Sequence, residues 1–338
     1  MCGISGVYDL AQKRKNLQQF LDRMNEAQKH RGPDDRGTFT EGPVGLGHVR
    51  LSIIDLSSAG HQPMLFGDRY ALVFNGEIYN YIELREKLIR AGYSFLTNTD
   101  TEVVLAAYDC WGEACQTRFN GFWAIALYDR RKQTLFLSRD RYGVKPLYYT
   151  FQPGYFVFAS EIKTLLQDEN IRRTANDAVI FDYLVNGFVD CTDETFFRDI
   201  RRLPAGHCMY LDPQGKREIR SYYELPYSEQ LIGQVDGETE ERFRKLFEDS
   251  IRLRLRADVP VGSCLSGGLD SSSIVCESSR QLKKQNAGTD QKTFSSCYQG
   301  DANDERQFID AVVEKTGVDA HYIYPTGDTL FADLDHLI

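Results

Sequence analysis

Apolar residues in the first 223 positions follow two spacings, one typical of helices and one typical of strands. Between Leu17 and Ala27 they recur at intervals of three and four, which predicts a helix that ends before the turn at 30–34. Further helices are predicted at about 81–91 and directly after Thr99, which forms a capping box with Glu102. Short β-type runs, bounded by Gly, Pro and Asp, cover residues 47–54, 70–74, 124–128, 134–138, 147–151, 155–159 and 207–223. This order of elements predicts layered sheets with helices between their strands.

The pattern changes after residue 223. A polar, glycine-containing stretch predicts a linker over residues 224–240. Beyond it, an apolar stripe from Phe243 to Leu255 predicts an amphipathic helix, residues 259–265 indicate a buried strand, and a second helix is predicted at about 273–282. The sequence therefore predicts one domain at 2–223 and a second at 241–338.

A turn rich in glycine and serine separates that buried strand from the second helix, over Ser266–Ser272. Glycines permit a tight turn with inward-facing amides, serines add hydroxyl donors, and the helix N-terminus adds partial positive charge. These properties favour phosphate binding. The turn lacks the Gly-Lys-Ser/Thr of a Walker loop, so transfer of a terminal phosphate is not indicated. A strand-to-helix turn without a binding role is the alternative.

Composition excludes several classes of partner and site. The 338 residues carry a formal net charge of -9, which argues against nonspecific affinity for nucleic acid or an anionic membrane. No signal peptide and no apolar run of about 18 residues is visible, so a cytoplasmic location is expected. The eight cysteines contain no CxxC pair, which supports neither a zinc site nor a disulfide framework.

Cys2 is the first candidate for chemistry. Removal of Met1 would leave a thiol and a free α-amine on the same residue, and the amine, with a pKa of roughly 7.7 to 8.0, could take the thiol proton near neutral pH. One residue would then supply both nucleophile and base. Judged by position alone, Cys2 is more often simply a small second residue.

Six motifs, in order, make the chain resemble the glutamine-hydrolysing asparagine synthetases. The resemblance covers nearly the whole chain and is highly specific. The Ser266–Ser272 turn then looks like the pyrophosphate loop of that family's synthetase domain. The motifs are Met1-Cys2-Gly3-Ile4, Arg31-Gly32-Pro33-Asp34, Gly47 to Asp55, Asn75-Gly76-Glu77-Ile78-Tyr79-Asn80, Asp100-Thr101-Glu102 and Arg139 to Leu147.

For the first domain, the resemblance implies an α+β N-terminal-nucleophile fold, a four-layer αββα sandwich in which Cys2 attacks the side-chain amide of glutamine. Asn75 and Gly76 are implied as oxyanion donors. The implied glutamine-binding residues are Arg50 for the carboxylate, Glu77 and Asp100 for the ammonium, and Leu51, Ile53, Asn75 and Gly76. Taken singly, Asn75-Gly76 could be a hairpin turn, Asp100 a helix-start charge and Arg50 a surface ion pair.

For the second domain, the resemblance implies an α/β ATP-pyrophosphatase-like unit with a pyrophosphate loop. It would activate a carboxylate as its adenylate, and ammonia from the first site would displace AMP. Mg²⁺ accompanies ATP as the expected cofactor, with Asp270 as a candidate ligand. The implied ATP-binding residues are Leu265, Ser266, Gly267, Gly268, Asp270, Ser271, Ser272 and Ser296.

The chain stops where family members continue into a second, acidic glycine loop, so we expect an incomplete synthetase domain. Three functions stay open. The first is asparagine synthesis from glutamine, ATP and aspartate; the second is an amidotransferase acting on another carboxylate. The third is a chain with glutaminase or glutamine-binding activity only. A homodimer is among the expected states, since dimerisation is common in the family.

Overall fold

The computed structural model describes residues 1–14, 16–227, 237–284, 291–298, 300–301, 304–332 and 334, and it divides into two compact units, Met1–Tyr227 and Ser228–Ile338. Residues 228–236 of the expected linker lie outside the described residues. The expectation is wrong for 237–240, because helix α6 already begins at Gly237. Glu238 and Glu240 in its first turn suit the positive end of the helix.

The first unit contains two six-stranded sheets among its described residues, with strand orders β10-β8-β9-β1-β3-β2 and β12-β11-β7-β6-β5-β4. All pairings within both sheets are antiparallel. The strands are β1 (Gly3–Tyr8), β2 (Asp35–Glu41), β3 (Val44–Arg50), β4 (Met64–Phe66), β5 (Tyr70–Ile78), β6 (Gly121–Asp129), β7 (Thr134–Arg139), β8 (Tyr148–Gln152), β9 (Tyr155–Ala159), β10 (Arg201–Arg202), β11 (His207–Leu211) and β12 (Arg217–Ser221).

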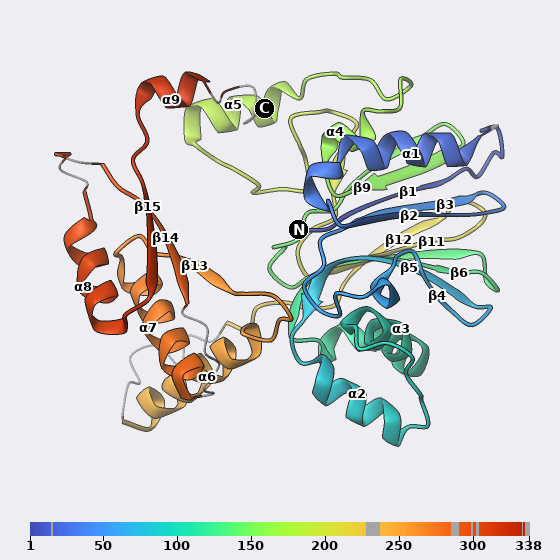
Figure 1. Ribbon diagram of the computed structural model, residues 1–338. Helices are drawn as coiled ribbons and strands as arrows, with labels where there is room; N and C mark the ends of the chain where they lie inside the picture. The colour runs from blue at the N-terminus through green and yellow to red at the C-terminus, as the bar shows by residue number, and fades with distance from the viewer. Residues whose placement is uncertain are drawn as a thin grey trace. The chain divides into compact units, whose positions relative to one another are not determined.

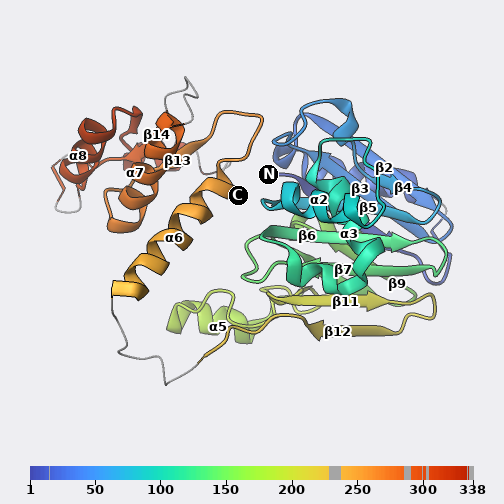
Figure 2. The ribbon, with the colours of Figure 1, turned by 90° about the horizontal axis from the view of Figure 1, so that it is seen from below.

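Three apolar cores separate four layers in this unit. One lies between the two sheets, one between the first sheet and helices α1 and α4, and one between the second sheet and helices α2 and α3 (Figure 1). Figure 2 shows β6, β7 and β11 side by side in the second sheet. The helices are α1 (Leu17–Ala27), α2 (Tyr81–Arg90), α3 (Asp100–Trp111), α4 (Ile162–Leu165) and α5 (Asp177–Asn186). The expected αββα sandwich is the arrangement found.

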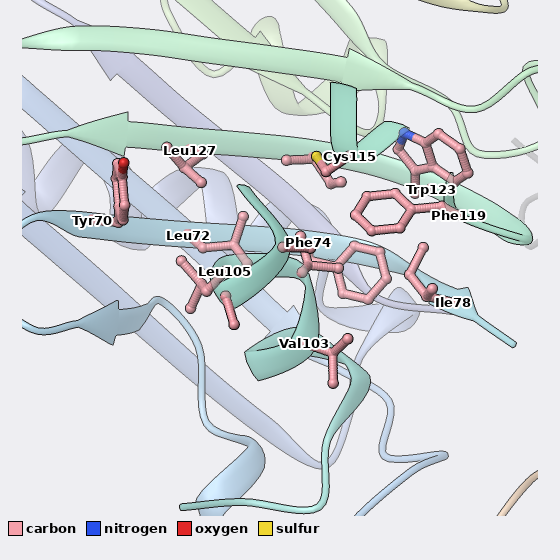
Figure 3. Close-up of a cluster of buried hydrophobic side chains, with 14 of the residues drawn as sticks. Tyr70, Leu72, Phe74, Ile78, Val103, Leu105, Cys115, Phe119, Trp123 and Leu127 are labelled. Atoms are coloured by element: carbon pink, nitrogen blue, oxygen red, sulfur yellow. The ribbon is translucent and has the colours of Figure 1, made fainter. Parts of the chain in front are cut away.

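Period-two alternation along β5 explains how it serves two cores at once. Tyr70, Leu72 and Phe74 point to α3, where they meet Val103 and Leu105 (Figure 3). The residues between them point to the opposite face, toward the first sheet. A strand covered on both faces is therefore apolar at nearly every position until Asn75.

One local expectation is wrong in the first unit, and one alternative is excluded. Residues 51–54 are not strand, because β3 ends at Arg50. Asn75-Gly76 is not a hairpin turn, because both residues lie inside β5 and pair with Ala124 and Trp123 of β6. The capping box at Thr99 is half formed: the Thr99 hydroxyl accepts the Glu102 N–H at 3.1 Å, whereas the Glu102 carboxylate accepts from Leu96 and Thr97.

The second unit is a parallel three-stranded sheet in the order β13-β14-β15 with helices, as its α/β pattern predicts. Its core is one small cluster that includes Leu265, Val275 and Ile309. Strand β13 is shorter than the expected 259–265, and α7 begins at Leu269, inside the predicted turn. The elements are α6 (Gly237–Arg254), β13 (Gly262–Cys264), α7 (Leu269–Lys284), β14 (Lys292–Ser296), α8 (Arg306–Thr316), β15 (Asp319–Ile323) and α9 (Gly327–Ala332).

Within the described residues, no helix combines the length and the apolar character that crossing a membrane requires.

Candidate active site

Strand alternation gathers polar side chains at one end of the layer between the two sheets of the first unit. In β3, Val44 and Leu46 belong to the inter-sheet core, so His48 and Arg50 continue the same row. In the register of β1 with β3, Gly3 pairs with Val49, which brings the neighbouring Cys2 beside Arg50. The first sheet thus contributes a thiol and a guanidinium to this end of the layer.

The second sheet contributes the facing row. Ala71 and Val73 of β5 belong to the inter-sheet core, so Asn75 and Glu77 extend toward the first sheet. Asn75 is 1% exposed, and its side-chain nitrogen Nδ2 has no hydrogen-bond partner among the described residues. Because an unmet buried donor is costly, this amide is suited to an acceptor supplied by a ligand.

The backbone of β5 supplies a second donor. Strand β4 pairs with β5 only as far as Leu72, so the edge of β5 is open beyond that residue. Along this edge Gln62 Oε1 accepts the Phe74 N–H at 2.7 Å and Asp100 Oδ2 accepts the Ile78 N–H at 2.9 Å. Backbone N–H groups two residues apart in a strand point to the same edge, so the Gly76 N–H lies on this edge between those of Phe74 and Ile78. A side chain there is excluded, because a Cβ on Gly76 would lie 2.1 Å from the Phe122 carbonyl oxygen.

The Cys2 thiol lies against the backbone that follows β3. Its Sγ is 3.4 Å from the Leu51 nitrogen and 3.5 Å from the Leu51 oxygen. Arg31 Nε donates to the Cys2 carbonyl oxygen at 2.9 Å and fixes the start of β1. Burial raises the pKa of the thiol, so Cys2 is protonated at neutral pH in this state and needs a base.

Glu77 and Asp100 form a carboxyl pair, in which Asp100 is buried and Glu77 is half-buried. Burial raises the pKa of both, and the proximity of Asp100 raises that of Glu77 further. Lys145 acts in the opposite direction on Glu77, while burial lowers the pKa of its own ammonium. A cation placed between the two carboxyl groups would favour their ionised forms, as the ammonium of an amino acid would.

Arg50 is not the surface ion pair considered as an alternative. It is 6% exposed and donates to the carbonyl oxygens of Ser57, at 2.8 Å, and of Asp55. Because guanidinium has five N–H donors, these contacts leave donors for a carboxylate. Gly60 permits this position, since a Cβ there would lie 1.9 Å from Arg50 Nη2.

The structure brings the expected glutamine-site residues together. A single pocket is lined by all of them except Asn75, whose neighbour Gly76 lines it. The roles assigned to these residues stay predictions. The lining residues are Cys2, Arg50, Leu51, Ile53, Ile54, Gly60, Gln62, Phe74, Gly76, Glu77, Thr99, Asp100 and Thr101.

Sequence reasoning assigned no role to Arg31, Gln62 or Lys145. Arg31 and Lys145 belong to two of the motifs that carry the family resemblance. Their place in these motifs was the sequence signal that could have identified them as site residues. Gln62 stands outside those motifs. Its contact with Phe74 depends on how β4 ends beside β5, which a local pattern does not disclose.

In the second unit, the expected phosphate-binding residues run from the loop after β13 into the first turn of α7. Gly267 has a φ of +88°, a conformation that favours glycine, and the Ser271 hydroxyl accepts from the Ser266 N–H at 3.3 Å. Ser296 ends β14, so it lies at the same carboxyl edge of the parallel sheet as the loop after β13. Asp270, Ser271 and Ser272 lie in the first turn of α7 rather than in a loop before it.

No group of three or more metal-ligating side chains occurs in the part of the chain that the structure describes. Asp270, in the first turn of α7, offers one carboxylate beside the loop. Mg²⁺ bound through nucleotide phosphates needs only one or two protein carboxylates, so this donor set fits a metal that arrives with ATP.

Comparison with known proteins gives two family matches. Residues 1–223 match the model for the glutamine amidotransferase domain, and residues 242–338 match the model for asparagine synthase. A solved glutamine phosphoribosylpyrophosphate amidotransferase from B. subtilis is 15% identical, with a TM-score of 0.51, and the match covers 96% of this chain and 81% of that one. This likeness concerns the fold alone, and it agrees with the αββα sandwich.

Several curated relatives match along most of the chain. A putative asparagine synthetase [glutamine-hydrolyzing] 2 of Methanocaldococcus jannaschii is 39% identical, covering 96% of this chain and 65% of the relative. Asparagine synthetase [glutamine-hydrolyzing] 3 of Bacillus subtilis is 33% identical, covering 95% and 54%. Amidase chyE of Penicillium rubens is 34% identical, covering 96% and 50%. The chain thus spans between half and two thirds of the length of these relatives.

Proposed function

Because the chain belongs to the glutamine amidotransferase family, we propose that its first unit hydrolyses glutamine to glutamate and ammonia, with Cys2 as nucleophile. We propose further that the second unit uses ATP to activate the β-carboxylate of aspartate, so that ammonia displaces AMP and yields asparagine, with release of pyrophosphate. The match of residues 242–338 to asparagine synthase supports this second step.

In the proposed hydrolysis, removal of Met1 leaves the α-amine on Cys2, where it accepts the thiol proton. The thiolate attacks the side-chain amide carbon, and the resulting oxyanion accepts hydrogen bonds from Asn75 Nδ2 and the Gly76 N–H. The tetrahedral intermediate collapses as the C–N bond breaks, and ammonia leaves with the proton held by the α-amine. Water then hydrolyses the thioester, releasing glutamate and restoring the thiol.

The observation that carries this proposal is the pair of donors at the open edge of β5. Asn75 Nδ2 is buried with no hydrogen-bond partner among the described residues, and the neighbouring Gly76 lines the pocket that also contains Cys2. Arg50 lies in the same pocket, and the Glu77–Asp100 pair completes it. An amino acid with a carboxylate, an ammonium and an amide matches these three groups of donors and acceptors.

The second unit would bind ATP through the loop Ser266–Ser272, with Leu265 and Ser296 near the nucleoside. Asp270 would hold Mg²⁺ together with the phosphates, and the metal would neutralise phosphate charge. The 34% identity to amidase chyE favours a different carboxylate as the second candidate.

The test is Cys2→Ala and Cys2→Ser, assayed for glutamate release from glutamine without ATP. Both variants should lose hydrolysis down to the background rate, because neither side chain can form the thiolate at neutral pH. Thermal unfolding should be unchanged within a few degrees, since the thiol makes only weak contacts with Leu51.

Cys191→Ala is the matched control, because Cys191 is an exposed free thiol of the same unit. It should retain the full rate. Intact-mass spectrometry of active protein should show that Met1 is absent. Ammonia release that survives in Cys2→Ala would contradict the proposal. In a separate assay supplied with glutamine, aspartate and Mg-ATP, asparagine formed with pyrophosphate in equal amounts would identify aspartate as the acceptor.

A further inference from the structure

His48 is fully buried between the two sheets, at the point where the apolar row of β3 meets the pocket. Its Nε2 lies 3.2 Å from the Phe74 carbonyl oxygen. Because a carbonyl oxygen only accepts, Nε2 carries the proton and donates it. Burial lowers the pKa of the ring to about 3, so His48 is neutral, and Nδ1 has no partner among the described residues.

The carbonyl that His48 holds belongs to the residue before Asn75. It lies on the open edge of β5, and the next N–H along that edge is that of Gly76. Gln62 Oε1 accepts the N–H of the same Phe74 at 2.7 Å. β4 does not pair with β5 at Phe74. The His48 and Gln62 side chains hold the carbonyl oxygen and the N–H of Phe74 in place of a paired strand.

The hydrogen bond also joins the two sheets. His48 lies on β3 of the sheet that supplies Cys2 and Arg50, and Phe74 lies on β5 of the sheet that supplies the oxyanion donors. Distances between a nucleophile and its oxyanion donors must be held within about half an ångström for full activity. A bond that spans the sheets one residue from Asn75 is placed to hold that distance.

We propose that His48 is a positioning residue, whose Nε2–H holds the Phe74 carbonyl and thereby orients Asn75 and Gly76 toward the intermediate formed on Cys2. The inference rests on the proposed glutamine hydrolysis. His48 itself transfers no proton, because its one N–H is committed to Phe74 and its ring is enclosed.

Three substitutions separate the donor from the ring. The side-chain nitrogen of glutamine is as many bonds from Cα as Nε2, that of asparagine as many as Nδ1, and leucine has no donor. We expect His48→Asn and His48→Leu to lower kcat for glutamine hydrolysis by about 10- to 100-fold, with KM changed less than about threefold. His48→Gln should recover most of kcat, and its pH profile should match that of the wild type.

Rates are expressed per competent site, counted by intact-mass detection of Cys2 labelled with 6-diazo-5-oxo-L-norleucine, so that loss of folded protein does not count as loss of kcat.

Gln62→Met removes the acceptor for the Phe74 N–H and tests the hold on Phe74 from its N–H side. It should lower kcat per labelled site as well.

A second measurement repeats His48→Asn in an Asn75→Ala background. If His48 acts through the oxyanion donors, its effect should shrink by at least threefold when one donor is already gone. An equal loss in both backgrounds, or equal kcat per labelled site in the Asn and Gln variants, would overturn the inference. The wild type must hydrolyse glutamine, and Cys2→Ala must abolish that hydrolysis. If either condition failed, the proposed function would be refuted rather than the role of His48.

Discussion

The pocket of the first unit and the serine-glycine loop of the second differ in what their donors do without a ligand. In the pocket, Asn75 Nδ2 is buried and unpaired among the described residues. In the loop, the Ser271 hydroxyl donates to the Gly268 carbonyl at 3.2 Å and lies 3.1 Å from the Ser266 hydroxyl. The pocket keeps its donors ready inside a rigid sandwich, whereas the loop must exchange its internal bonds for those of a phosphate.

The strongest test of readiness in the pocket is Asn75→Ala. We expect kcat for glutamine hydrolysis to fall by about 10² to 10³, with a small change in KM, because the amide donor matters most when the oxyanion forms. Steady-state kinetics of glutamate release measures both constants. A rise in KM at constant kcat would instead assign Asn75 to ground-state binding.

Arg50→Lys tests whether the same pocket binds the carboxylate of glutamine. Lysine keeps the charge but cannot serve both the loop carbonyls and a carboxylate, so KM should rise roughly 10- to 100-fold while kcat falls less than about threefold. Arg36→Lys, at a largely exposed arginine of β2, is the matched control and should leave both constants unchanged. If kcat instead fell by the same factor as KM rose, Arg50 would only hold the loop in place.

Gly267→Ala tests the loop. Its φ of +88° strains any other residue, and a Cβ would lie 3.1 Å from the Glu305 carbonyl oxygen. Because the strain is of order 1–3 kcal/mol, we expect affinity for Mg-ATP, measured by calorimetry, to fall about tenfold. Gly317→Ala has similar strain, with φ +65°, but a Cβ there meets nothing within 4 Å. Equal affinities in the two variants would contradict a phosphate role for the loop.

Glu77→Gln tests the carboxyl pair through pH, with the smallest expected effect. Burial raises the pKa of Glu77 in the folded state above its ordinary 4.5, so the folded protein binds more protons than the unfolded chain above that pH. Stability therefore falls as pH rises from about 4.5 toward the raised pKa. Unfolding temperatures measured between pH 5 and 9 should decline more steeply for the wild type than for the variant. Parallel curves would show that Glu77 is not held in its neutral form.

Local signals predicted α1, α2 and α3 of the first unit, but not α4 and α5. α1 begins where the Asn16 side chain accepts the Gln19 N–H, and α3 begins where Thr99 accepts the Glu102 N–H. α7 was placed too late, because Leu269–Ser272 contains no stop signal and simply continues the helix. Glycine and serine favour turns, but the N-terminus of a helix also accommodates them.

The site was predicted residue by residue through family resemblance, and only partly through physics. Asn75-Gly76 has the composition of a hairpin turn, and only the long-range pairing of β5 with β6 keeps it extended. The burial of Asp100, the partial burial of Glu77 and the contact of Gln62 with Phe74 depend on chain segments that meet only in the fold. In β3, Val44, Leu46, His48 and Arg50 share one face, but the predicted run 47–54 began after the first two of them.

The shortness of β4 has a consequence for what this protein can associate with. An unpaired strand edge normally offers a template on which another chain can add a strand. Here Pro63, which has no N–H, precedes β4, and the edge of β5 beyond Leu72 is occupied by the Gln62 and Asp100 side chains on either side of Gly76. Another strand could not form its backbone hydrogen bonds here, because side chains already bind the Phe74 and Ile78 N–H groups. The carbonyl oxygen of a small molecule needs only the Gly76 N–H between them. Because β4 begins only at Met64, opposite Leu72, the rest of this edge of β5 is suited to a small molecule rather than to a further strand.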